Sequence, residues 1–171
     1  MSEKHVKDDY MGRYEELMNV YHDEIYIDDT YSLCGKFKGF YDNGVILIDK
    51  HLPQHHRLEI LAEEIAHHKL TYGDITDQSV FNNRKFEGYA RRHAMENIIS
   101  IQGIIDAFKN NLHNLYEVAN YFEVSEGFVQ QCIINLKLRY GLSTIYKGYL
   151  IQFEPLRVFE YKKLNSRGYV E

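Results

Sequence analysis

Residues 54–70 constrain the fold more than any other segment, because their apolar side chains recur at helical spacing. Leu58, Leu61, Ala62 and Ile65 fall on one face of such a helix. The opposite face is polar. The sequence therefore predicts an amphipathic helix that packs one side against the rest of the fold while the other side lines a cleft.

The polar face of this predicted helix gathers two carboxylates and two imidazoles on little more than one turn, at Glu63, Glu64, His67 and His68. The spacing differs by one residue type from His-Glu-x-x-His, in which two metal ligands lie four residues apart and the intervening glutamate is a general base. Glu63 and His67 occupy the ligand positions, and Glu64 occupies the position of the base. We therefore predict a metal site.

A third ligand must come from another element, because a hydrolytic zinc site needs three protein ligands and one open position. The best candidate is Glu87, on a second predicted helix over residues 83–99. Taken alone, Glu87 is better explained as a solvated charge that pairs with Arg91 four residues later. The motif upstream favours the ligand interpretation.

His68 follows Glu64 by four residues and has three possible roles. It could orient Glu64, bind the metal in place of Glu63, or stabilise the oxyanion of the reaction; we favour a supporting role beside the ligands. Three further side chains are weaker candidates for such a role: Tyr72, Asp74 and His93.

The carboxylate at position 63 has a consequence for the choice of metal. Two carboxylates and one imidazole neutralise more of the metal charge than a set with two histidines, and they are harder ligands. We therefore expect Zn²⁺ to be bound with weak selectivity, with Mn²⁺ or Fe²⁺ tolerated, and turnover to be slow.

Two β-prone runs flank Asn43-Gly44, which is a strong signal for a hairpin. The second run directly precedes the helix with the metal motif. We predict that it forms the upper rim of the site, where a substrate adds as an extra strand. That edge strand would comprise Val45, Ile46, Leu47 and Ile48.

The C-terminal part is predicted to contain a helical pair, over residues 112–122 and 125–140, that resembles a helix-turn-helix. Residues 149–153 are predicted to form a short strand or an extended arm. The predicted fold class is α+β. A zincin-like metalloprotease core, with a small sheet or hairpin packed on the site helix, spans residues 1–108, and the helical region spans residues 109–171.

Charge and composition limit the possible partners. The net charge of -5 implies no general attraction to nucleic acid. The second helix of the pair offers only Lys137, with Arg139 just after it, so direct DNA binding is disfavoured. No apolar run is long enough to cross a membrane, and the N-terminus has no signal core. The isolated Cys34 and Cys132 suggest reduced thiols in a cytoplasmic protein.

Several segments together resemble the ImmA/IrrE metallopeptidases of phages and mobile elements. The resemblance implies a cytoplasmic protease of a bacterial host that cleaves a phage or mobile-element repressor and so relieves repression. It also implies a metal site that His67, Glu64 and Glu87 match and from which Glu63 departs. The segments that resemble the family are 61–68, 73–75, 87–94, 119–128 and 149–156.

Two other classes of function remain open at this point. Glu63 would allow a catalytically weak or inactive member that acts as a repressor-binding module. The helix-turn-helix-like pair would allow a DNA-binding regulator, although a helical platform that docks the repressor suits its charges better.

Overall fold

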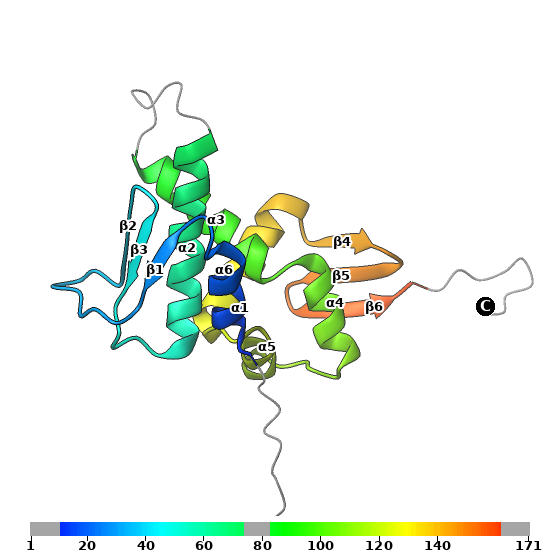
Figure 1. Cartoon of the computed structure of the whole chain (residues 1–171). Helices are drawn as coiled ribbons and strands as arrows, with labels where there is room; N and C mark the ends of the chain where they lie inside the picture. Colours follow the sequence, from blue (N-terminus) through cyan, green and yellow to red (C-terminus); the bar gives the residue numbers. More distant parts are fainter. Residues whose placement is uncertain (1–10, 74–82, 162–171) are drawn as a thin grey trace, which may run out of the picture.

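The protein has mixed α+β architecture, as the sequence predicts (Figure 1). The computed structural model describes residues 11–73 and 83–161, and side chains within 11–70 and 88–161. The elements in these ranges are α1 (Arg13–Tyr21), β1 (Tyr26–Asp28), β2 (Gly39–Asp42), β3 (Val45–Ile48), α2 (Gln54–Gly73), α3 (Asn83–Ile98), α4 (Ile101–Lys109), α5 (Leu115–Phe122), α6 (Glu126–Tyr140), β4 (Ser143–Tyr146), β5 (Tyr149–Phe153) and β6 (Leu156–Glu160).

The first sheet has the strand order β1-β3-β2, with β1 parallel and β2 antiparallel to β3. The predicted hairpin is confirmed, and its turn residues Asn43 and Gly44 both have positive φ. The prediction that residues 45–48 form an edge strand is wrong. β1 pairs with β3 on the side away from β2, from Tyr26 opposite Val45 to Asp28 opposite Leu47, so β3 is the central strand and the edges are β1 and β2.

Helix α2 packs one face of this sheet with its apolar side. The predicted stripe of Leu58, Leu61, Ala62 and Ile65 is buried, with at most 5% of any of these residues exposed. β3 contributes its alternate residues to the same core, including a fully buried Ile46. Burial of this stripe fixes the rotation of α2, and its polar side is left facing away from the core.

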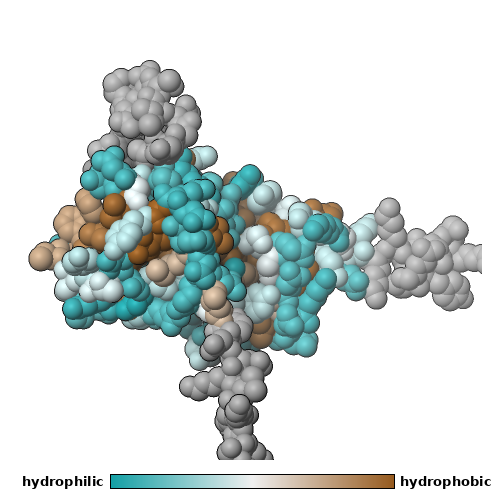
Figure 2. All heavy atoms as spheres, viewed as in Figure 1, coloured by the Kyte–Doolittle hydropathy of each residue, from teal (hydrophilic) through white to brown (hydrophobic). Residues whose placement is uncertain are grey.

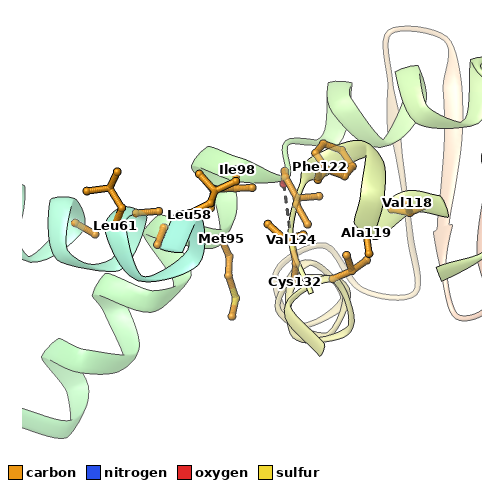
Figure 3. Close-up of a cluster of buried hydrophobic side chains, with 14 of the residues drawn as sticks. Leu58, Leu61, Met95, Ile98, Val118, Ala119, Phe122, Val124 and Cys132 are labelled. Atoms are coloured by element: carbon orange, nitrogen blue, oxygen red, sulfur yellow. Dashed lines mark hydrogen bonds between the residues drawn. The ribbon is translucent and has the colours of Figure 1, made fainter. Parts of the chain in front are cut away.

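The core continues from α2 and α3 into α5 and α6, as the labelled side chains in Figure 3 show. Met95 and Ile98 of α3 lie between Leu58 on α2 and the side chains of the C-terminal helices. Cys132 of α6 belongs to this core, and burial raises the pKa of its thiol to about 12. Both cysteines are free, and the buried one is poorly suited to act as a nucleophile.

The predicted helical pair is confirmed, with sharper boundaries. α5 begins at Leu115 rather than near residue 112, because Asn114 caps it in a reciprocal capping box with Glu117. Ser125 caps α6 by accepting the backbone N–H of Phe128, and Gly141 ends the helix. Whether this pair acts as a helix-turn-helix stays a prediction.

A second, antiparallel sheet with the order β4-β5-β6 follows α6. The sequence predicted only one strand or an arm here. The turn between β4 and β5 is Lys147-Gly148, with positive φ at both residues, and this pair is a weaker hairpin signal than Asn-Gly. Only β5 supplies fully buried side chains, Ile151 and Phe153.

Most of the visible surface is hydrophilic, and hydrophobic side chains gather over the first sheet (Figure 2). Exposed apolar residues on or next to its strands include Tyr26, Phe37, Phe40 and Val45. Within the ranges that the structure describes, no helix has the length and hydropathy needed to cross a membrane.

Candidate metal centre

The polar face of α2 is the centre of the candidate site. Glu63, Glu64 and His67 are half-buried, whereas His68 is buried with 8% exposure. Glu63 and His67 are four residues apart and project from the same side of the helix. Glu64 and His68 repeat this spacing one residue later, on the side that turns toward the sheet.

Strand β2 approaches α2 closely at Glu64. A Cβ atom on Gly39 would lie 2.3 Å from Cγ2 of Ile60 and 2.8 Å from Oε1 of Glu64. These separations are below any ordinary nonbonded contact, so only glycine allows the strand to lie this close to the carboxylate. Gly39 was not predicted as a site residue, and its only sequence signal is a glycine inside the β-prone run that precedes Asn43-Gly44.

Tyr41, two residues further along β2, contacts His68. Its hydroxyl lies 2.9 Å from Nδ1 of the imidazole, and the two rings meet edge to face with centroids 5.4 Å apart. The hydroxyl also accepts the backbone N–H of Gly44 at 3.3 Å. His68 is therefore held on its Nδ1 side by the sheet, which agrees with a supporting role better than with metal ligation through that nitrogen.

Helix α3 reaches the same face of α2 through Arg91. The guanidinium donates from Nε and Nη2 to one oxygen of Glu63, Oε1, at 3.3 and 3.2 Å. Local spacing alone pairs Arg91 with Glu87, four residues earlier. The contact with Glu63 joins residues 28 positions apart, so no local pattern could reveal it.

Two polar contacts fix the N-terminal half of α2. Arg57 binds Asp29, which follows β1, at 3.0 Å, and Glu59 accepts the backbone N–H of Ser125 at 2.6 Å. The second contact joins the site helix directly to the start of α6. Both contacts lie within two turns of Glu63. Glu59, four residues before Glu63, projects from the same side of the helix, so its contact with Ser125 orders the N-terminal end of the polar face.

The other predicted site residues are distributed unevenly. His93 lies on α3, and its Nδ1 is 3.1 Å from Nδ2 of Asn97. The backbones of Tyr72 and Glu87 belong to α2 and α3, but their side chains lie outside the described ones, as does Asp74 entirely. Among the described side chains, no three or more potential ligands cluster as a metal site.

The donors that can be described fit part of a metal site. Glu63 and His67 supply a carboxylate and an imidazole from one helix face, a combination suited to Zn²⁺, Mn²⁺ or Fe²⁺. Within the described ranges, every hydrogen bond to the Glu63 carboxylate reaches Oε1. Oε2 is the atom with which Glu63 could bind a cation.

A mixed α+β fold with the Glu63-Glu64-x-x-His67 spacing on a helix beside a small sheet is what we expect of a metallopeptidase. The comparison with protein families agrees: the Peptidase_M78 family, described as the IrrE N-terminal-like domain, matches residues 14–133. The chain belongs to this family, so the resemblance to ImmA/IrrE metallopeptidases is confirmed. None of the curated proteins compared with the chain matches it.

Proposed function

We propose that the protein is a metal-dependent endopeptidase in which Glu64 is the general base. The main support is the arrangement at α2: the carboxylate of Glu64 lies under Gly39 of β2, beside the pair of potential ligands Glu63 and His67. A base next to a metal and next to a strand is what hydrolysis of an extended peptide requires.

We propose Glu87 as the third ligand, and the packing of α3 against α2 supports this role. Asn97 and Ile98 of α3 line a cavity of about 200 Å³ together with Leu58 and Ala62 of α2. Arg91, about two turns earlier, contacts Glu63. Figure 1 shows that the two helices run antiparallel, so one more turn back along α3 leads to Glu87 as one more turn along α2 leads to His67.

Glu64, Tyr41 and His68 have separate roles in the proposed hydrolysis. The metal, when bound, would polarise the scissile carbonyl and the attacking water. Glu64 removes the proton from this water and passes it to the leaving amine. The Tyr41 hydroxyl accepts the Gly44 N–H and forms a hydrogen bond with Nδ1 of His68, which fixes the imidazole beside Glu64.

The edge strand β2 is the better candidate for substrate pairing now that β3 is known to be central. β2 is the strand that approaches Glu64, and its far side has no partner strand in the described part of the chain. A peptide added there would extend the sheet over the polar face of α2, with main-chain hydrogen bonds supplying affinity.

The substrate class comes from the ImmA/IrrE resemblance: a phage or mobile-element repressor in a bacterial cytoplasm. The charges of α6 agree with a partner other than DNA. Lys137 pairs with Glu154, and Arg139 pairs with Glu96 at 2.6 Å, so both cations of its last turn are engaged by carboxylates of the same chain. A DNA-reading helix needs such cations for phosphates.

Co-expression with candidate repressors tests the function, with repressor cleavage and bound metal measured together. We expect cleavage by the parent protein and a loss of about 10²- to 10⁴-fold for Glu64→Gln, since general-base catalysis contributes that range. Glu126→Gln is the matched control, because this glutamate is exposed at the start of α6.

The outcomes separate the classes of function. Cleavage that persists in Glu64→Gln would contradict the role of the base. A stable complex with a repressor, without cleavage by the parent or the variant, would identify a binding module instead. A salt-dependent gel shift of operator DNA by this protein alone would favour the DNA-binding regulator, and no shift at low salt would exclude it.

A further inference from the structure

The ion pair between Arg91 and Glu63 has an unusual geometry for an arginine and a carboxylate. A bidentate pair normally places one N–H on each carboxylate oxygen. Here both donors, Nε and Nη2, converge on Oε1. Neither of these hydrogen bonds uses Oε2 of Glu63.

The two partners also differ in exposure. The side chain of Arg91 is 63% exposed, whereas that of Glu63 is 19% exposed. Arg91 thus reaches inward from the surface of α3 to a carboxylate that α2 holds in a more buried place. The guanidinium uses Oε1 of Glu63, which leaves Oε2 for a metal. The guanidinium and the metal would then compete for the negative charge of one carboxylate.

We propose that Arg91 tunes the metal centre by sharing Glu63 with the metal. This inference rests on the proposed function. A divalent cation held by two carboxylates and one imidazole is electrically neutral. The Arg91 guanidinium adds one positive charge, so metal, ligands and guanidinium together carry a net charge of +1. A metal with a neutral histidine in place of Glu63 would carry the same net charge with its ligands.

Two opposite effects follow from this added charge. Repulsion between the guanidinium and the cation weakens metal binding. The same charge withdraws electron density from Glu63, so the metal remains a stronger Lewis acid than two free carboxylates would allow. Arg91 therefore lowers metal affinity and raises the electrophilicity of the centre, which offsets the effect expected from the carboxylate at position 63.

Metal affinity gives a direct test that does not depend on activity. The dissociation constant of Zn²⁺ for the purified full chain is measured by competition with a chelator of known affinity. We expect Arg91→Gln to bind Zn²⁺ about threefold more tightly than the parent, a size typical of an exposed ion pair. Arg92→Gln, which removes an exposed charge one residue away, should leave affinity unchanged.

Two further variants identify the route of the effect. Arg91→Lys keeps the charge and should retain an affinity near that of the parent, even if Arg91→Gln folds poorly. In a Glu63→Gln background, Arg91→Gln should change the affinity less than it does in the parent, because the part of the effect that passes through the shared carboxylate is gone. Thermal melting of each variant confirms that the compared proteins are folded.

Failure of this inference differs from failure of the proposed function. If the parent binds Zn²⁺ and Arg91→Gln binds it equally or more weakly, Arg91 does not compete for Glu63 and the inference is wrong. If the parent binds neither Zn²⁺ nor Mn²⁺, the metallopeptidase proposal fails and the inference fails with it.

Discussion

The two three-stranded sheets differ in the contacts they make with the helices beside them. The first sheet brings the backbone of Gly39 to Glu64 and the hydroxyl of Tyr41 to His68. The second sheet buries Ile151 and Phe153, and its polar contacts, such as that between Lys137 and Glu154, lie at the surface.

The match to the Peptidase_M78 family includes the first sheet and ends before the second. The match covers residues 14–133, which include the first sheet, α2 and α3, and it ends within α6 before β4 begins. We therefore assign the proposed chemistry to the first sheet and its helices, and we expect the second sheet to contribute mainly to stability through Ile151 and Phe153.

The largest effect on stability is expected from Phe153→Ala in the second sheet. Phe153 is 1% exposed, and its ring stacks on Tyr140. Removing a buried aromatic ring costs about 3–5 kcal/mol, measured by denaturant unfolding. Phe159→Ala, at an exposed position of the same sheet, is the control and should change stability little. A folded Phe153→Ala protein that has lost metal binding would contradict this assignment.

Gly39→Ala should have a smaller effect on stability and a large effect on cleavage. The added methyl group would overlap Ile60 and Glu64, so β2 or the base must move. We expect a cost of about 1–3 kcal/mol from overpacking and a loss of cleavage of about a hundredfold from misplacement of the base. Gly127→Ala, whose Cβ would meet only Ser125 Oγ at 3.9 Å, should retain full cleavage.

Tyr41→Phe removes the hydroxyl that holds Nδ1 of the buried His68. The loss of this hydrogen bond should cost about 1 kcal/mol of the free energy of unfolding, and cleavage should fall several-fold because the imidazole is no longer fixed. Tyr26→Phe, at an exposed tyrosine of β1, should be neutral. Equal effects of the two changes would show that the Tyr41 contact has no special role.

The smallest effect is expected from Lys137→Ala, and it should depend on pH. The Lys137 ammonium lowers the pKa of Glu154 in the folded protein. The pair therefore contributes stability above the pKa that Glu154 has in the unfolded chain, and the contribution is lost as the pH falls through the lower, folded pKa. Near neutral pH the parent should unfold at a slightly higher temperature than Lys137→Ala. In acid the two proteins should unfold at the same temperature.

Local patterns predicted the parts of the fold that depend on neighbours in sequence. The buried stripe of α2, the turn at Asn43-Gly44 and the cap at Ser125 each follow from residues within a few positions of one another. The apolar stripe of α2 also predicted which face of the helix is polar, because burial of its four apolar residues fixes the rotation of the helix.

The contacts that define the candidate site could not be predicted in this way. Tyr41 and His68 are 27 positions apart, and Glu63 and Arg91 are 28 apart, so only the folded chain reveals them. The central position of β3 depends on its parallel pairing with β1, a three-residue strand with no strong signal of its own. The outer strands of the second sheet have mostly exposed side chains, so hydrophobic alternation was weak there.

Metal content measured on purified protein decides whether α2 carries a metal site. Protein prepared with Zn²⁺ or Mn²⁺ is freed of unbound ions and analysed by mass spectrometry. The account predicts about one divalent ion per chain for the parent, loss of that ion in His67→Ala, and full retention in the control His22→Ala, which changes an exposed histidine after α1. Equal metal content in parent and His67→Ala would contradict the proposed metal site on α2.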